Sequence, residues 1–411
     1  MSHHIDENAK DVLLFEAIHP VGKQAFEEVS LNVDLLDHSL VGDELNAKIK
    51  HNQVVGVRSK TKITSEVLSA NPHLTAIGCF CIGTNQVALE KANELGIPVF
   101  NAPYSNTRSV AELVISEMIS LSRQIAHKSG LAHQGVWEKT AAGSNEVRGK
   151  VLGIVGYGHI GSQVSILAES LGLKVVFYDT IKKLPLGNAS SSATLDKLLE
   201  KSDFVTLHVP ETMETKDMMG KKQFGKMKRG AHLLNLSRGT VVVIDDLVEA
   251  LKSGQLAGAA VDVFPVEPKS NKDQFDSPLQ GVNNVILTPH IGGSTQEAQE
   301  AIGHEVSESL IKYIQRGATT GAVNFPQLEI PPLRTGARLL NVHENKPGVL
   351  GDINTLISNA GINISAQFLS TDSKIGYLVV DFEDVTKAKE LAIEVAKKDV
   401  SIKTRVILGH A

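Results

Sequence analysis

The stretch Val151-Leu-Gly-Ile-Val-Gly-Tyr-Gly-His-Ile-Gly161 runs from an apolar segment directly into three closely spaced glycines. Small residues let a backbone turn tightly and approach a pyrophosphate, and a helix starting near His159 would point free N–H groups and its positive dipole end at that anion. Asp179 ends the next apolar run, where a carboxylate would bind the ribose hydroxyls of NAD and repel the extra phosphate of NADP. A structural glycine turn is the alternative, but it leaves the flanking strand, helix and acid unexplained. We therefore predict a dinucleotide site in the middle of the chain, with NAD as the cofactor.

Composition narrows the class of protein. The chain has 411 residues, of which 42% are hydrophobic and 21% charged, so we expect a globular protein of roughly two to three domains. A formal net charge of -5 leaves no excess of basic residues, and a small molecule is therefore a better partner than a nucleic acid. The sequence has neither a run of about eighteen apolar residues nor the order of a signal peptide. We expect no membrane attachment and a cytoplasmic location.

The chain has two cysteines, Cys79 and Cys81, in a segment that reads as a buried strand. No further cysteine accompanies them to complete a metal site. We expect both thiols to be reduced and structural, and we predict no metal centre.

The order of apolar runs predicts three domains. Between residues 11 and 100, short apolar runs alternate with helical patterns, which is typical of a parallel α/β unit. A long helix over 109–125 leads into the dinucleotide unit, and a second over 296–315 could return the chain to the first unit. We predict a discontinuous substrate-binding domain (10–107 and 294–325) and a Rossmann NAD-binding domain (108–293), each with a doubly wound parallel sheet.

The C-terminal quarter has a different pattern. Three prolines between Asn324 and Gly336 predict a linker over 326–336. Beyond it, residues 337–411 read as strand, helix, strand, strand, helix and strand, an order that fits a small ferredoxin-like βαββαβ module. This module carries no obvious catalytic constellation.

Three residues in predicted strand-end loops can perform the chemistry that a nicotinamide enzyme needs, namely proton transfer and the binding of an acidic substrate. His290 follows an apolar strand and has a pKa suited to reversible proton transfer, and Glu267 could fix its tautomer. Arg238 offers a two-pronged clamp for a carboxylate. Taken alone, such a histidine is more often a capping or core residue, and Glu267 could be a solvated loop acid. Their occurrence together, downstream of a nucleotide site, favours catalysis.

Six motifs resemble those of the D-isomer-specific 2-hydroxyacid dehydrogenases, and the similarity extends from about residue 10 to residue 408, including a C-terminal domain of the ACT type. The motifs are Val155-Gly-Tyr-Gly-His-Ile-Gly161, Phe177-Tyr-Asp179, Leu207-His-Val-Pro210, Asn235-Leu-Ser-Arg-Gly-Thr240, Asp262-Val-Phe-Pro-Val-Glu-Pro268 and Thr288-Pro-His-Ile-Gly-Gly-Ser-Thr295.

The resemblance implies roles for these motifs. His290 with Glu267 would be the acid/base, and Arg238 would bind the 2-oxo acid. Residues implied in NAD binding are Gly156, Gly158, His159, Ile160, Gly161, Asp179, His208, Pro210, Leu236, Ser237 and Asp262.

The substrate side is less sharply defined. The resemblance points to three segments of the chain, and a phosphate on the substrate would need a cation from them. Arg58 is the first choice, although a surface arginine at a strand end is an equally good interpretation. The candidate substrate residues are Arg58, Ser59, Lys60, Asn106 and Arg108.

In the last module, the loop that opens with His343 resembles the amino-acid-binding loop of ACT-type domains, with serine as the expected effector. His343, Asn345 and Asn363 would supply hydrogen bonds, and backbone N–H groups at a helix start would bind the carboxylate. The alternative is an oligomerisation module that senses nothing. Trp137 lies in a stretch that the resemblance places at the contact between subunits, and a tetramer is the implied assembly; Trp137 could instead pack in its own core.

The resemblance implies one expected reaction, the NAD-dependent oxidation of D-3-phosphoglycerate to 3-phosphohydroxypyruvate at the entry to serine synthesis. Another 2-hydroxy acid, such as glycerate or 2-hydroxyglutarate, is the first alternative, because the catalytic residues would be the same. The second is an NAD-sensing corepressor that binds protein partners. The appended sensor-like module favours an enzyme.

Overall fold

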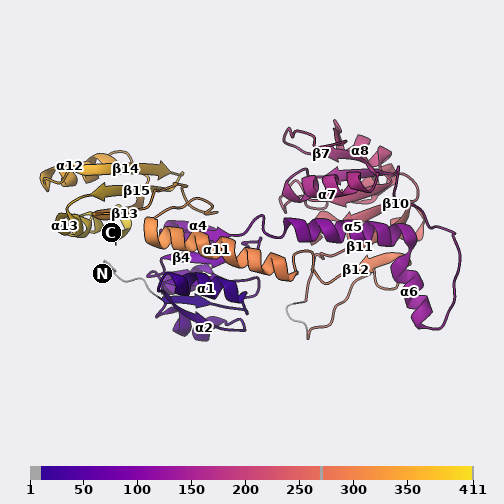
Figure 1. Cartoon of the computed structure of the whole chain (residues 1–411), viewed down its shortest axis with the longest axis horizontal. Coiled ribbons are helices and arrows are strands. Elements are labelled where there is room, and N and C mark those ends of the chain that lie inside the picture. The colour runs from indigo at the N-terminus through magenta and orange to yellow at the C-terminus, as the bar shows by residue number, and fades with distance from the viewer. Residues whose placement is uncertain (1–10, 269–271, 410–411) are drawn as a thin grey trace. The chain divides into compact units, whose positions relative to one another are not determined.

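The computed structural model describes residues 11–268 and 272–409, which divide into two compact units (Figure 1). The first unit contains the chain up to Ser105 and again from Gln299 onward, and the second contains Asn106–Ala298. In the described part of the chain, no helix is both long and apolar enough to cross a membrane.

The first unit begins with a parallel sheet whose strand order is β2-β1-β3-β4-β5. Both faces of this sheet are covered: Leu13, Val55 and Ile77 enter one core, while Val12, Val54 and Ala76 enter the other. Near-continuous apolar runs are expected for strands buried on both sides. The strands are β1 (Asp11–Leu14), β2 (Asn32–Leu35), β3 (Val54–Val57), β4 (Ala76–Cys79) and β5 (Val99–Asn101), and the helices are α1 (Pro20–Glu28), α2 (Gly42–Ile49), α3 (Ser65–Ala70), α4 (Leu89–Glu94) and α11 (Gln296–Arg316).

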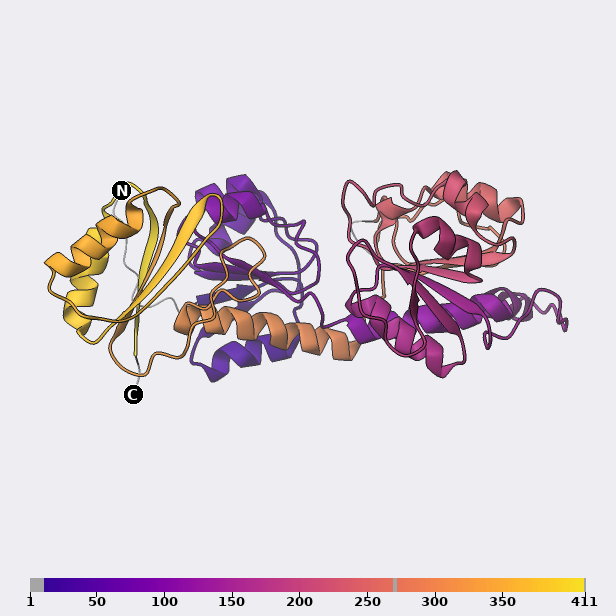
Figure 2. The ribbon, with the colours of Figure 1, turned by 90° about the horizontal axis from the view of Figure 1, so that it is seen from above.

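The C-terminal module is a four-stranded antiparallel sheet of order β14-β15-β13-β16. Figure 2 shows both of its helices on one face of the sheet, as the βαββαβ prediction requires. The other face contributes Leu340, Val342 and Tyr377 to the same apolar cluster as Phe100 and Leu310 of the first sheet and α11. Its elements are β13 (Ala337–Glu344), α12 (Val349–Asn359), β14 (Ile364–Thr371), β15 (Ile375–Phe382), α13 (Val385–Ala396) and β16 (Ser401–Leu408).

The segment predicted as a linker has no helix or strand, but it is packed. Ile330 is fully buried, in the cluster that the first sheet and the C-terminal module share, and Phe325 just before the segment is nearly so. The Thr319 hydroxyl donates to the carbonyl of Pro326 at 2.7 Å. The prolines therefore interrupt regular structure without freeing the chain from the core.

The second unit is the doubly wound sheet predicted from the glycine motif, with the order β12-β11-β10-β9-β6-β7-β8. The direction of winding reverses between β6 and β9, and the carboxyl ends of the strands at this point are where such sheets bind ligands. The strands are β6 (Val151–Val155), β7 (Lys174–Tyr178), β8 (Ser190–Ser191), β9 (Phe204–Leu207), β10 (Ala231–Asn235), β11 (Leu256–Val261) and β12 (Val285–Leu287). The helices are α5 (Thr107–Arg123), α6 (Ile125–His133), α7 (His159–Ser170), α8 (Leu195–Lys201), α9 (Lys221–Lys226) and α10 (Ile244–Lys252), with a 3-10 turn, η1 (Gly239–Val241).

Two local expectations change. The helix predicted over 109–125 is broken at Gln124, whose left-handed backbone (φ 55°) separates α5 from α6. The alternative that Trp137 packs in its own core is wrong, because 86% of its surface is exposed.

The thiols of Cys79 and Cys81 are both free, and Cys79 is buried at the end of β4.

Candidate active site

The turn between β6 and α7 requires glycine at two of its positions. Gly156 has a φ of +93°, and a Cβ there would lie 2.3 Å from the carbonyl oxygen of His208. A Cβ on Gly161 would lie 2.2 Å from the carbonyl oxygen of Gly156, so a side chain would separate helix from strand. At Gly158, which caps α7, a Cβ would meet no atom within 4 Å. The chain leaves open space where a pyrophosphate would approach the helix N-terminus.

The carboxylate of Asp179 lies beside this turn, directly after β7. Its Oδ2 accepts the backbone N–H of Tyr157 at 2.9 Å, and its Oδ1 accepts the N–H of Ile181 at 2.9 Å. The ring of Tyr157 stacks on Phe177 with 3.9 Å between centroids, which fixes the turn against the strand. Asp179 is therefore held in place with a partly exposed carboxylate, as a ribose-binding acid would need to be.

The other predicted cofactor residues follow β6, β9 and β10. His159 is an exposed first residue of α7, Ile160 packs partly against the core, and Pro210 is exposed. Leu236 and Ser237 are buried directly after β10. Burial lowers the pKa of His208 to about 3, so its ring is neutral; its Nε2 lies 2.9 Å from the Thr206 hydroxyl, and its buried Nδ1 has no partner among the described residues.

The imidazole of His290 and the carboxylate of Glu267 form a pair. Nδ1 of His290 lies 2.9 Å from Oε2 of Glu267, and Oε1 of Glu267 accepts the backbone N–H of Phe264 at 3.1 Å. The hydrogen bond that His290 donates to the Glu267 carboxylate raises the pKa of His290 above its usual value, although burial opposes this. Burial also raises the pKa of Glu267, but the hydrogen bond and charge of His290 outweigh it and lower that pKa overall. His290 has a φ of 55°, a left-handed conformation that is uncommon for residues other than glycine and is enriched at functional sites.

Arg238 follows β10 in a turn that its neighbours hold. The side-chain amide of Asn235 donates from Nδ2 to the carbonyl of Arg238 at 3.0 Å. Oδ1 of Asn235 accepts both the N–H and the hydroxyl of Ser237. Nη1 of Arg238 donates to the carbonyl of Ser237 at 2.7 Å, which directs the half-buried guanidinium. Its positive charge contributes to lowering the pKa of both His290 and Glu267, so the three groups share one electrostatic environment.

Asp262 fixes the loop that carries His290. Its buried carboxylate accepts the Thr288 hydroxyl at 2.7 Å and the backbone N–H groups of Ile291 and Gly292, each at 2.8 Å. Asp262 was expected to contact NAD, and that contact stays a prediction. The structure gives its carboxylate a second task, which is to hold residues 288–292 against the end of β11.

The predicted phosphate-binding residues of the first unit lie in the loop after β3. Glu16, in a left-handed conformation, accepts the backbone N–H groups of Lys60 at 3.0 Å and Thr61 at 2.6 Å. The carbonyl of Arg58 accepts the side-chain amide of Gln86 at 2.7 Å. Arg58 is half-buried, while Ser59 and Lys60 are exposed. The loop is thus held from two sides, with Lys60 at the surface and Arg58 half-buried.

Asn106 and Arg108 belong to the second unit. Asn106 precedes α5, and its buried Oδ1 has no hydrogen-bond partner among the residues that the structure describes. Nε of Arg108 donates to Glu112 at 2.6 Å on the exposed face of α5. That Arg108 and Arg58 bind one substrate stays a prediction.

The predicted effector residues are placed differently from one another. His343 is buried, with Nδ1 3.0 Å from Oδ1 of Asn341, and burial lowers its pKa. Asn345 is exposed and donates from Nδ2 to the carbonyl of Asp372 at 2.7 Å. Asn363 is exposed immediately before β14. The Asn345 side chain thus holds the turn between β14 and β15.

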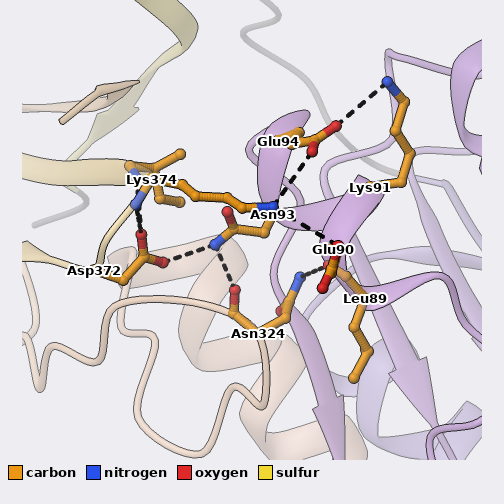
Figure 3. A network of polar contacts seen from close by, with 9 residues as sticks. Leu89, Glu90, Lys91, Asn93, Glu94, Asn324, Asp372 and Lys374 are labelled. Atoms are coloured by element: carbon orange, nitrogen blue, oxygen red, sulfur yellow. Dashed lines mark hydrogen bonds and ion pairs between the residues drawn. The ribbon is translucent and has the colours of Figure 1, made fainter.

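Figure 3 shows how that turn contacts α4 of the first sheet. The Asn93 amide donates to Oδ2 of Asp372 at 2.8 Å and to the carbonyl of Asn324 at 2.7 Å. Nζ of Lys374 lies 3.4 Å from Glu94 and 3.8 Å from Glu90. The backbone N–H of Asn345 donates to the carbonyl of Lys374. A continuous set of hydrogen bonds therefore joins the predicted effector loop to the first sheet.

Several residues of the site were not singled out from the sequence. Asn235, Thr288 and Glu16 are common polar residues near strand ends, and nothing in their local pattern marks their partners. Glu117 is different, because it occupies a position on the apolar face of α5, four residues before Leu121 and three after Val114. A charged residue at an apolar position of a helix was a usable signal.

Two family models match parts of the chain. The NAD-binding domain of the D-isomer-specific 2-hydroxyacid dehydrogenases matches residues 115–292, and the acetohydroxyacid synthase small-subunit-like ACT domain matches residues 339–400. The chain is 51% identical to the D-3-phosphoglycerate dehydrogenase of Haemophilus influenzae over 404 residues, 98% of each chain. It is 52% identical to that of Escherichia coli K12 over 392 residues, 94% of this chain and 95% of the relative.

Solved structures show the same fold over about three quarters of the chain. The D-lactate dehydrogenase of Aquifex aeolicus, complexed with NAD and lactic acid, superposes with a TM-score of 0.65 at 27% identity, covering 74% of this chain and 95% of that one. The TT0316 protein of Thermus thermophilus gives a TM-score of 0.68 at 29% identity, covering 76% and 99%. Taken with the glycine turn and the histidine–glutamate pair, these likenesses show that the chain belongs to the D-3-phosphoglycerate dehydrogenase family and that its second unit is an NAD-binding domain.

Proposed function

We propose that this NAD-dependent dehydrogenase oxidises D-3-phosphoglycerate to 3-phosphohydroxypyruvate, the first step of serine synthesis. The observation that carries the proposal is the 2.9 Å pair of His290 and Glu267 in one electrostatic environment with Arg238, in the unit that binds NAD. The names and near-complete coverage of the relatives support the choice of substrate.

His290, Glu267 and Arg238 have different roles in the proposed reaction. The glycine turn after β6 and the carboxylate of Asp179 would hold NAD, which would supply the hydride acceptor for C2 of the substrate. Because Nδ1 of His290 pairs with Glu267, Nε2 is the nitrogen that takes the hydroxyl proton, and Glu267 stabilises the imidazolium that forms. Arg238 holds the substrate carboxylate and the oxygen that becomes the carbonyl, with its charge in place before the reaction begins.

A substrate panel tests the proposal. NADH absorbance would be followed with D-3-phosphoglycerate, glycerate and 2-hydroxyglutarate at matched concentrations. We expect the highest kcat/KM for the phosphorylated acid, and Arg58→Ala should raise the KM for that acid while leaving the kcat/KM for glycerate nearly unchanged. Equal rates with all three acids would favour a broader 2-hydroxyacid dehydrogenase. No turnover with any of them, together with tight NADH binding, would favour the corepressor alternative.

We also propose that serine inhibits the enzyme by binding at the loop that contains His343 and Asn345. Asn363, which is exposed immediately before β14, would supply a further hydrogen bond. Support comes from the ACT-type match and from the hydrogen bonds that link Asn345, through Asp372 and Asn93, to the first sheet. A ligand at this loop would alter the hydrogen bonds that Asp372, in the turn between β14 and β15, makes with Asn345 and Asn93. Serine titration should lower the rate and raise the thermal midpoint, and Asn345→Ala should weaken both effects without changing uninhibited kcat. A serine titration that moves neither quantity would remove this proposal.

The assembly and the domain roles are further proposals. Exposed apolar residues Ile125, Val136 and Trp137 lie within one stretch of thirteen residues of the second unit, which suits a contact between subunits of a tetramer. Light scattering coupled to size exclusion would give the mass, and Trp137→Ala should lower it. We propose that residues 10–107 with 294–325 bind substrate, that 108–293 bind NAD, that 326–336 connect the regulatory module of 337–411, and that the enzyme is cytoplasmic.

A further inference from the structure

Glu117 is a buried acid of the second unit that the mechanism above does not use. It lies in α5 with 3% of its surface exposed, on the face that packs into the core. Its Oε1 lies 3.4 Å from Oγ1 of Thr288, and its Oε2 is buried without a hydrogen-bond partner among the described residues. A charged carboxylate placed in this way would be poorly compensated.

The position of one hydrogen decides the protonation state of Glu117. The Thr288 hydroxyl has a single proton and two acidic neighbours, Asp262 at 2.7 Å and Glu117 at 3.4 Å. The shorter contact takes the proton, because 2.7 Å is the usual distance of an O–H···O bond and the Asp262 carboxylate also accepts two backbone N–H groups. Oγ1 of Thr288 can then only accept from Glu117. The carboxyl of Glu117 must therefore carry a proton of its own to make this contact.

The surroundings of Glu117 contain little charge. Of the elements packed against α5, β11 and β12 have no titratable side chain, and β10 has only His232, whose ring stacks on Phe204. Helix α7 has His159 at its start and Glu169 near its end, where the Glu169 carboxylate lies beside Gly187. Helix α6 carries His127, Lys128 and His133, none of them buried. Asp262 is the charged group that acts on Glu117.

We propose that Glu117, in its protonated form, is a positioning residue: it donates to Thr288, Thr288 donates to Asp262, and Asp262 holds the loop 288–292 on which His290 lies. The inference rests on the proposed function, because it assigns a support for the acid/base of that reaction. Glu117 touches neither substrate nor cofactor in this account. It acts by keeping these hydrogen bonds in one direction, so that Glu117 donates to Thr288 and Thr288 donates to Asp262.

The electrostatics agree with this order. Burial and the negative charge of Asp262 together raise the pKa of Glu117 to about 8, even when the Thr288 hydroxyl is counted as a donor that lowers it. In the order proposed here Thr288 accepts instead, which favours the protonated form of Glu117 further. Glu117 is therefore protonated at neutral pH. When the pH rises through about 8, Glu117 loses its proton, the donor to Thr288 disappears, and a second negative charge faces Asp262. The loop that carries His290 then loses its support at alkaline pH.

The pH profile of kcat/KM tests this role with two variants of Glu117. If the ionised form is inactive, the wild-type value should fall about 30-fold between its maximum and pH 9.5, as expected for one group with a pKa of about 8. Glu117→Gln keeps a neutral donor, so its activity at pH 7 should remain within about threefold of wild type and the alkaline fall should vanish. Glu117→Leu has no donor and should be about tenfold slower at pH 7, also without the alkaline fall.

A matched control and a second readout separate this inference from the substrate assignment. Glu200→Gln, at an exposed position of α8 in the same unit, should keep the wild-type profile. Infrared difference spectra of the NADH complex should show a protonated carboxyl band at pH 7 that Glu117→Gln removes, whatever the substrate is. An alkaline fall unchanged in Glu117→Gln, or no such band in wild type, would overturn the role of Glu117; failure to oxidise D-3-phosphoglycerate alone would overturn only the proposed function.

Discussion

Oε2 of Glu267 lies 2.9 Å from Nδ1 of His290, and each side chain shifts the other's pKa toward the charged pair. Oxidation of the substrate requires a neutral imidazole, so kcat/KM should rise with pH through the raised pKa of His290. Glu267→Gln removes the carboxylate, and we expect the rising limb to move to lower pH and the plateau to fall by about 100-fold. The measurement is kcat/KM from pH 5 to 8 in buffers of constant ionic strength. An unshifted limb would show that Glu267 does not control the base.

Arg238 is expected to tolerate no cationic substitute. Its planar guanidinium offers two parallel donors to a carboxylate and also bonds the carbonyl of Ser237, whereas lysine is a single point of charge. Arg238→Lys should lower kcat/KM by about 100-fold. Steady-state kinetics would be compared with the thermal midpoint, which should not change. Wild-type turnover by this variant would exclude the clamp.

Asp179 is expected to set the preference for NAD over NADP. The side chain accepts two backbone N–H groups, so Asp179→Asn keeps an acceptor while it removes the charge that repels the 2′-phosphate. We expect the ratio of kcat/KM for NAD to that for NADP to fall by about tenfold or more. Kinetics with both cofactors measure this ratio. Asp196→Asn, at the surface of α8, serves as the control and should leave the ratio unchanged.

Arg338 should be essential for the stability of the first unit. It faces Asp381 across β13 and β15, bonds both carboxylate oxygens at 2.6 and 2.7 Å, and donates to the carbonyls of Arg316 and Pro331. Arg338→Ala leaves Asp381 buried and unpaired, which should cost about 3–5 kcal/mol in the free energy of unfolding. Chemical denaturation of this variant and of the exposed control Arg334→Ala gives the difference. A double variant with apolar residues at 338 and 381 should recover most of the loss.

The sequence was sufficient for the sheets and insufficient for their side-chain partners. Alternating apolar runs and the glycine turn predicted both parallel sheets, and the βαββαβ order predicted the C-terminal module, because these depend on periodicity and local turn chemistry. The pairing of Asp262 with residues 288–292, or of Glu16 with the loop after Arg58, depends on loops that meet only after folding. The burial of Ile330 in a proline-rich segment was hidden for the same reason: its core is assembled from distant strands.

The C-terminal sheet shares an apolar cluster with the first parallel sheet, to which it contributes Leu340, Val342 and Tyr377. Deleting residues 337–411 would expose this apolar layer to water, so we expect the shortened protein to aggregate or unfold. Loss of the C-terminal module would therefore have to be accompanied by polar substitutions on the first sheet and on α11, where the module now covers apolar side chains.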